Sequence, residues 1–220
     1  KKFNSSPVYG QMVDAVSPQP KLEEVDYVFV SDFFADEVTG GAELSLEALI
    51  NKCPSSFVKI KSTDLSSTHI EYYKEKQWIF GNAVFLNKEI VNTISGLNLS
   101  YSIVEFDYKY CKYRNPEVHK LIGDGECNCV DTVHGEMIKP FFTRADKVFF
   151  MSEKQRQDSV NVLQLDNNKT IVLSSVFSDD TLNYISSLRQ KNSSKSDSWI
   201  VSDSPQPIKG STRAKEWCAN

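Results

Sequence analysis

Five side chains that can bind a metal ion fall in one short window of this sequence. They are Cys111, His119, Cys127, Cys129 and His134, which include three of the five cysteines and two of the three histidines. Thiolate and imidazole are the ligands that Zn²⁺ prefers in closed tetrahedral sites. A structural zinc on Cys111, His119, Cys127 and Cys129, with His134 as a further candidate ligand, is therefore one interpretation. The alternative is that these thiols are small buried hydrophobes, since the Cys-x-Cys spacing differs from the common Cys-x2-Cys knuckle.

A second pattern, Thr39-Gly40-Gly41-Ala42-Glu43, follows an apolar run and opens an amphipathic one. Glycines let a ligand approach the backbone closely, and a helix N-terminus offers unpaired N–H groups to a phosphate. Gly40 and Gly41 are therefore candidates for binding a diphosphate. The pattern is neither a G-x-G-x-x-G fingerprint nor a Walker loop, so it supports neither NAD binding nor ATP hydrolysis. The alternative is a plain turn before a helix.

These residues need elements to position them, and the chain alternates strand and helix patterns. Short apolar runs predict strands at 25–30, 56–60, 78–80, 102–106, 147–151 and 170–173. Helix patterns stand between them at 43–53, at 88–95 and over 133–141, where Pro140 should kink or divide the helix. A Ser152-x-x-Gln155 capping box opens the next helix, and Asp179 or Asp180 caps the last one of this series. Such alternation predicts an α/β fold with a doubly wound, mostly parallel, Rossmann-like sheet.

The distribution of these strand and helix patterns along the chain suggests a domain organisation. Residues 1–24 are expected to be an N-terminal arm, 25–190 the Rossmann-like domain and 191–198 a polar linker. Residues 199–220 would be the start of a second, truncated α/β domain. They are expected to form a strand at 199–201 and a helix with Ala214, Trp217 and Cys218 on one face. The net charge of −4 and pI of about 5.5 argue against a broad nucleic-acid-binding surface. The few cysteines and the lack of a signal or membrane segment lead us to expect a cytoplasmic protein.

Three blocks of the sequence resemble family 4 glycosyltransferases. The block YVFVSDFFADEVTGGAELSLEALI is similar to the opening of that family, RADKVFFMSEKQRQ to its late acceptor-domain strand and helix, and WIVSDSPQPIKGSTRA to the start of its donor domain. The resemblance implies a two-domain GT-B fold of which this chain is mainly the N-terminal, acceptor-side half. It also implies a nucleotide-sugar donor, a sugar or glycan acceptor and no required cofactor, with Gly40 and Gly41 facing the donor diphosphate.

The chain departs from the family pattern where many members carry a histidine near the end of the fourth strand. That stretch reads Val104-Glu105-Phe106-Asp107-Tyr108, without histidine. Asp107 or Glu105 could stand in that zone and act as a general base on an acceptor hydroxyl. The alternative is that both carboxylates are structural or solvated.

The leading hypothesis is thus the acceptor-side part of a glycosyltransferase that is inactive without its donor domain. No feature of the sequence supports contact with a membrane, although a lipid-linked acceptor would require it. The competing hypothesis is a stand-alone α/β binding or regulatory domain, either zinc-stabilised or resembling a receiver, with Asp26 and Asp32 flanking the first strand.

Overall fold

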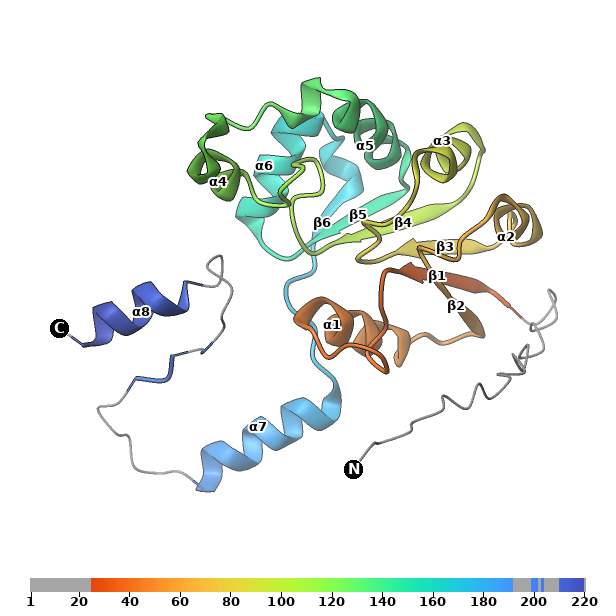
Figure 1. Ribbon diagram of the computed structural model, residues 1–220. Coiled ribbons are helices and arrows are strands. Elements are labelled where there is room, and N and C mark those ends of the chain that lie inside the picture. The colour runs from red at the N-terminus through yellow and green to blue at the C-terminus, as the bar shows by residue number, and fades with distance from the viewer. Residues whose placement is uncertain (1–24, 192–198, 202, 204–209, 220) are drawn as a thin grey trace, which may run out of the picture.

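Six parallel strands form one sheet in the order β2-β1-β3-β4-β5-β6 (Figure 1). The computed structural model describes residues 25–191, 199–201, 203 and 210–219. The strands are β1 (Tyr27–Ser31), β2 (Phe57–Lys61), β3 (Gln77–Phe80), β4 (Tyr101–Glu105), β5 (Lys147–Phe150) and β6 (Thr170–Val172). All six predicted strand segments of the Rossmann-like domain lie in this sheet, so the prediction of a parallel α/β fold is confirmed.

Helices connect the strands and lie on both faces of the sheet. Helix α1 (Gly41–Ile50) packs on one face, and α2, α3, α5 and α6 form a layer on the other (Figure 1). Their bounds are α2 (Ser67–Tyr72), α3 (Lys88–Gly96), α5 (Val133–Arg144) and α6 (Glu153–Leu163). Because β1 lies between β2 and β3, the winding reverses there, and α/β folds bind ligands beside such a reversal, at the carboxyl ends of the strands.

The main core lies between the sheet and the four-helix layer. Trp78, Phe80, Tyr101 and Phe150 are almost completely buried there. Two polar atoms of this core are satisfied by backbone carbonyls: Trp78 Nε1 donates to Tyr73 O at 3.0 Å, and Tyr101 Oη donates to Phe141 O at 2.7 Å. The aromatic residues that predict strands in the sequence therefore also form the core between the sheet and the four-helix layer.

Four short elements complete the connections. Between β4 and α5 run α4 (Pro116–His119), the π-helical turn η2 (Lys120–Asp124) and the 3₁₀ turn η3 (Cys129–Asp131), and η4 (Asn167–Lys169) precedes β6. After β6 come α7 (Asp179–Lys191) and α8 (Ser211–Cys218). Figure 1 shows α7 extending away from the sheet, beyond α1.

Several local predictions are corrected by the structure. Helix α5 continues through Pro140 without division, and the short α2, capped by Ser66, was not anticipated. Ser178, rather than Asp179 or Asp180, caps α7, because its Oγ accepts the hydrogen bond from Thr181 N at 3.2 Å. The predicted capping serine of α6 is confirmed: Ser152 Oγ accepts from Gln155 N at 3.2 Å.

Two local predictions in the C-terminal part have different outcomes. Residues 199–201 form no strand, and Ile200 is fully exposed, so the strand prediction there is wrong. The helix predicted after Gly210 is present as α8, and Trp217 packs edge-on against Trp199. The expected arm at 1–24, and the expected linker except residue 191, lie outside the described residues. None of the helices described is long and apolar enough to cross a membrane.

Candidate metal centre and anion pocket

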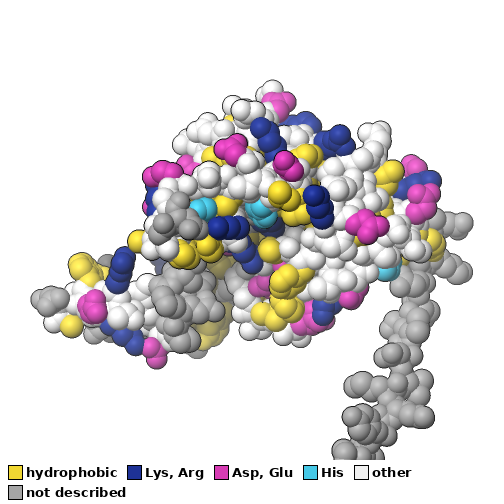
Figure 2. All heavy atoms as spheres, turned by 45° about the horizontal axis from the view of Figure 1, so that its top comes forward, with side chains coloured by type: hydrophobic (Ala, Val, Ile, Leu, Met, Phe, Trp, Pro, Cys, Tyr) yellow, Lys and Arg dark blue, Asp and Glu magenta, His cyan; other side chains and the backbone are white. Residues whose placement is uncertain are grey.

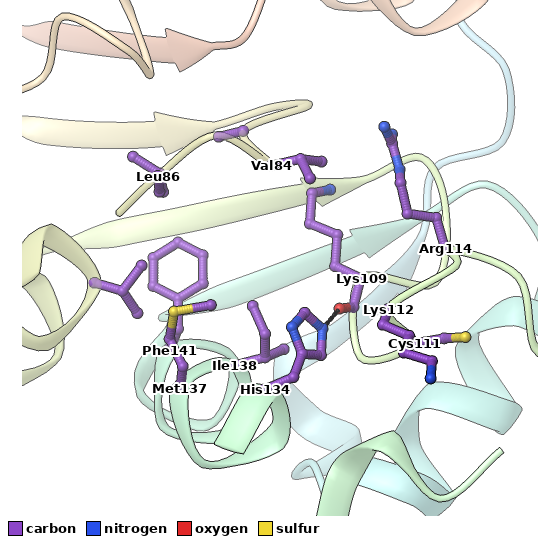
Figure 3. A pocket seen from close by; sticks show the side chains of 12 residues that line it. Val84, Leu86, Lys109, Cys111, Lys112, Arg114, His134, Met137, Ile138 and Phe141 are labelled. Carbon is purple, nitrogen blue, oxygen red and sulfur yellow. Dashed lines mark hydrogen bonds between the residues drawn. The ribbon is translucent and has the colours of Figure 1, made fainter. Parts of the chain in front are cut away.

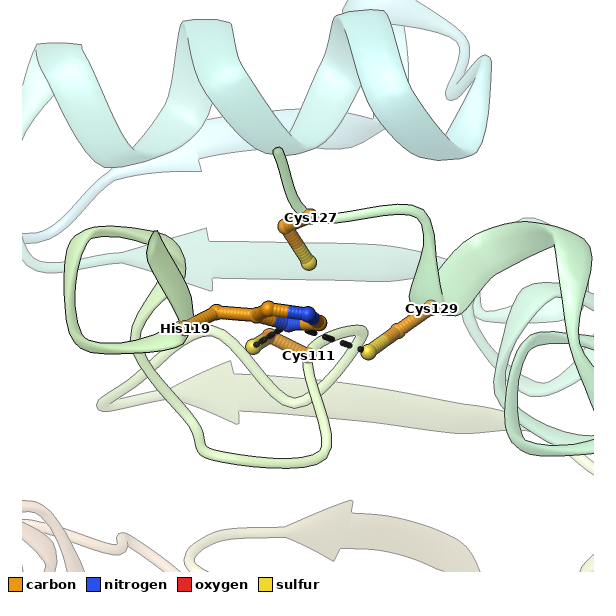
Figure 4. A group of neighbouring side chains, drawn as sticks. All are labelled: Cys111, His119, Cys127 and Cys129. Atoms are coloured by element: carbon orange, nitrogen blue, oxygen red, sulfur yellow. Dashed lines mark hydrogen bonds between the residues drawn. The ribbon is translucent and has the colours of Figure 1, made fainter. Parts of the chain in front are cut away.

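The connection between β4 and α5 brings four potential metal ligands together (Figure 4). The ligand atoms of Cys111, His119, Cys127 and Cys129 all lie within 4.8 Å of one another. Cys111, His119 and Cys129 are buried, and Cys127 is half-buried. The convergence expected from the sequence is therefore confirmed for these four residues.

Two distances within this cluster match those of a tetrahedral zinc site. Zn–S and Zn–N bonds of about 2.3 and 2.0 Å place the S and N atoms of a tetrahedral site about 3.5 Å apart. His119 Nδ1 lies 3.6 Å from Cys111 Sγ and 3.5 Å from Cys129 Sγ. Three thiols and one imidazole with no further ligand make the donor set of a closed structural site.

Local structure holds two of the ligands, His119 and Cys129, in position. Asn115 Oδ1 accepts hydrogen bonds from the first turn of α4, Pro116 occupies that turn, and His119 ends the helix. The ring of Tyr113 packs edge-on against His119, with centroids 5.1 Å apart. Cys129 opens η3 and accepts a hydrogen bond from Lys112 N at 3.4 Å. This is the kind of outer contact that orients a metal ligand.

Gly135 allows α5 to pack against the turn that carries Cys129. A Cβ atom at this position would lie 2.0 Å from the carbonyl oxygen of Val130. Only glycine permits this approach of one backbone to another. The glycine of the His134-Gly135 pair therefore supports the cluster, although the sequence alone does not reveal it.

Without a bound cation the Cys127 thiol is protonated. Burial, together with the neighbouring Cys111 thiol, raises the pKa of the Cys127 thiol to about 12. A bound divalent cation reverses this preference because it stabilises thiolates directly. Metal binding here must consequently release protons.

His134 lies outside the cluster. Its Nε2 atom is 2.7 Å from Lys109 O, and its ring lines a cavity of about 50 Å³ beside Met137 and Ile138 (Figure 3). Of the two candidate histidines, only His119 therefore belongs to the metal cluster.

A larger pocket of about 560 Å³ lies over the carboxyl ends of the strands. Gly40, Gly41 and Glu43 form the α1 side of the pocket, and Asp107 and Arg114 lie in its wall. It is also lined by Ala42, Ser45, Asn82, Phe106, Met151, Ser175 and Phe177. The two glycines singled out from the sequence and one of the two candidate carboxylates therefore meet in one place.

The start of α1 offers backbone donors to this pocket. Gly40 is the N-cap and makes no side-chain cap. The first intrahelical hydrogen bond is donated by Leu44 N to Gly40 O, so the N–H groups of 41–43 have no acceptor within the helix. A Cβ at Gly41 would meet nothing within 4 Å, whereas one at Gly40 would meet the Glu43 carboxylate.

A chain of polar side chains crosses the pocket wall. Arg114 pairs with Asp107 and donates to Asn82 Oδ1 at 2.7 Å, and Asn82 Nδ2 donates to Glu43 Oε1 at 3.4 Å. Arg114 adopts a left-handed backbone with a φ of 60°, which a β-carbon disfavours. The same turn carries Cys111, whose carbonyl accepts from Arg114 N at 2.8 Å. The cluster and the pocket therefore share one loop.

Glu105 lies in the core rather than in the pocket wall. Its carboxylate accepts from Lys109 Nζ at 2.8 Å and from Lys109 N at 3.0 Å. Burial raises the pKa of Glu105, and the Lys109 ammonium opposes that shift. Of the two candidate bases, only Asp107 lines the pocket.

Asp32 ties together the loops that follow three strands. Its buried carboxylate accepts from Val84 N at 2.9 Å, from Phe85 N at 3.0 Å and from Ser62 Oγ. Asp26 precedes β1, at the opposite end of the strand. The two aspartates therefore do not form the acidic pocket of a receiver.

Charge on the surface is mixed. On the face shown in Figure 2, the Lys and Arg side chains of the described residues are interspersed with Asp and Glu. They form no continuous basic stripe on that face. A scan against protein-family models found no matching family, and a search of curated proteins found no match.

Proposed function

We propose that this chain is the acceptor-side domain of a glycosyltransferase and that its pocket receives the diphosphate of a nucleotide-sugar donor. The observation that carries the proposal is the position of the Gly40-Gly41 helix start beside Arg114, at the carboxyl ends of the strands. The resemblance of three sequence blocks to family 4 glycosyltransferases points the same way. The donor's base and sugar would be bound largely by a second domain, so we expect no sugar transfer by these residues alone.

The physical argument concerns the charge that develops during transfer. When the bond between the sugar and the diphosphate breaks, negative charge grows on the diphosphate oxygens. Backbone N–H groups at the start of α1 and the Arg114 guanidinium can stabilise that charge without reorganising. Open space at Gly41 allows a phosphate to come close to the backbone.

The acceptor hydroxyl must lose a proton, and we propose that Asp107 is the base that accepts it. Asp107 is paired with Arg114 in the structure. A diphosphate would compete for the guanidinium and leave the Asp107 carboxylate free to act as general base. Donor binding would thereby precede activation of the acceptor.

The test of this function is titration with a probe and a matched pair of variants. Pyrophosphate and the common uridine and guanosine diphosphate sugars are titrated calorimetrically into the chain. Gly41→Val should weaken binding by about tenfold or more, because the added bulk blocks the close approach. Gly96→Val is the control, since Gly96 also has open space around it and lies at the end of α3, outside the pocket.

A transfer assay on a protein extended beyond residue 220 completes the test. Nucleotide binding that depends on Gly41, together with transfer by the extended protein, would support the assignment. Gly41-dependent binding without transfer would favour the stand-alone binding domain. Failure of every probe to bind would contradict both.

We further infer that Cys111, His119, Cys127 and Cys129 hold one structural zinc ion. Protein expressed with zinc should carry about one equivalent by elemental analysis, and Cys129→Ser should lose it. Cys53→Ser is the matched control, because Cys53 is a free thiol outside the cluster. Metal-free protein with an unchanged melting temperature after zinc addition would contradict the site.

A further inference from the structure

The two faces of the sheet are covered unequally. On the face toward the four-helix layer, Trp78, Phe80 and Val148 are almost fully buried. On the opposite face, Ile79 is only half-buried and Ile171 is 39% exposed. A parallel sheet is normally covered on both faces. Among the described elements, α1 covers only part of this second face.

Beside the end of α1 this face holds an apolar groove of about 510 Å³. Its floor comes from the strands and includes Phe29, Ile79, Val104 and Phe149. Phe29 and Val104 in the floor are themselves buried, and Ile79 and Phe149 are half-buried. Its rim includes Leu49, Cys53 and Pro54 from the end of α1, and Leu173 at the end of β6. The groove opens on the side of the sheet that α1 occupies.

Helix α7 carries an apolar stripe that nothing in the described structure covers. Leu182, Ile185 and Leu188 are 50%, 45% and 38% exposed, and their spacing of three residues places them on one side of the helix. An isolated helix of this length is marginal in water, so α7 requires a partner for this stripe.

The connection to α7 places it within reach of the groove. Leu173 lines the groove, and five residues separate it from the first residue of α7. At the helix start Asp179 pairs with Lys52 at 2.5 Å, and Lys52 directly precedes Cys53 on the groove rim. Ser174 has a φ of 65°, so the connection leaves β6 through a strained residue that can relax by rotation.

We propose that α7 folds onto this groove within the same chain and buries Leu182, Ile185 and Leu188 against the sheet. The segment between β6 and α7 also contributes Ser175 and Phe177 to the anion pocket. Docking of α7 holds that segment at both ends and so fixes this wall of the pocket. The helix is thus an internal docking partner whose position shapes a neighbouring binding site.

The experiment uses the native Cys53 as a reporter of the groove. The rate of N-ethylmaleimide labelling at Cys53 is measured by peptide mass spectrometry in a zinc-loaded Cys218→Ser background. Ile185→Asp should speed labelling by about tenfold or more, because burial of one isoleucine shifts an equilibrium by at least that factor. Asn183→Asp, which adds the same charge on the other side of α7, should leave the rate unchanged.

Light scattering and dilution separate the intramolecular arrangement from its competitors. A monomeric mass with a concentration-independent labelling rate supports docking within one chain. A dimer whose protection of Cys53 disappears on dilution would show that a second copy fills the groove and would overturn the proposal. Equal labelling rates in the parent and both α7 variants would overturn it as well.

Discussion

Arg114 connects the two candidate sites. Its guanidinium contacts Asp107 and Asn82 in the pocket, and its backbone hydrogen-bonds to Cys111 of the metal cluster. The residue has no sequence signature, because its importance comes from a turn that only the folded chain defines. Gly40, Gly41 and the Cys/His cluster, by contrast, are visible from residue type and spacing.

The first prediction concerns Arg114. Replacing it by glutamine should weaken pyrophosphate binding by about 1.5–3 kcal/mol, the usual contribution of a hydrogen bond to a charged group. Lys112→Gln removes the same charge from the same turn, but Lys112 does not line the anion pocket. Calorimetric titration of both variants checks this. Equal losses of affinity in the two would show that Arg114 acts through net charge alone.

The second prediction concerns the buried Glu105–Lys109 pair. Lys109→Met should destabilise the fold by about 3–5 kcal/mol at pH 7, because it leaves a carboxylate unpaired in the core. The pKa of Glu105 is raised by burial, so its protonated form is favoured in the folded state. The variant should therefore be more stable at low pH and lose stability as the pH rises. Part of the stability that it lacks at pH 7 should be recovered at pH 5.

Urea unfolding at pH 5 and pH 7 in excess zinc measures this difference. The double variant Glu105→Gln/Lys109→Met is the control, because it removes both charges and leaves any pH effect on the metal cluster in place. A recovery at pH 5 as large in the double variant as in Lys109→Met would contradict the assignment to Glu105.

At the scale of elements, hydrophobic pattern was enough to locate the strands but not every connection. The strand runs are apolar and β-branched because the sheet packs against the four-helix layer on one face and, in part, against α1 on the other (Figure 1). The short α2 and the turns η2 and η3 lack such a pattern. Ser178 caps α7 in place of its acidic neighbours because of local backbone geometry, which composition does not specify. The apolar run 199–201 forms no strand, because no neighbouring strand pairs with it in the described structure.

The third prediction belongs to the contact between α5 and η3. Gly135→Ala should destabilise the fold by about 1–3 kcal/mol, because its Cβ would overlap the Val130 carbonyl. It should also reduce zinc affinity, since η3 carries Cys129. Gly96→Ala, with open space at the new Cβ, should be neutral or slightly stabilising. Thermal melts with and without zinc compare the two, and an equal response would refute a close approach at Gly135.

At the scale of the whole molecule, one loop joins the proposed metal to the proposed ligand. Asp107, Arg114 and the four metal ligands all lie between β4 and α5. This convergence is non-local: the pocket also needs residues that follow β1, β3, β5 and β6. Sequence reasoning could place the glycines at a strand end but could not show which side chains would face them.

The fourth prediction follows from that shared loop. Removing zinc with a chelator should lower the melting temperature and increase hydrogen exchange over residues 107–132. It should also weaken pyrophosphate binding by about tenfold, because Arg114 loses its fixed position. Restoring zinc should reverse all three effects. Unchanged pyrophosphate affinity in the metal-free protein would show that the metal cluster does not influence the anion pocket.

The strand order has a consequence for how the chain is made. From β3 onward each new strand pairs with the strand just synthesised, β4 on β3, β5 on β4 and β6 on β5. Only the β1–β3 pairing must bridge an intervening strand. During synthesis, each strand after β3 therefore finds the strand with which it pairs already made. We expect that a nascent chain arrested after β4 or β5 can form a smaller sheet with the same strand order.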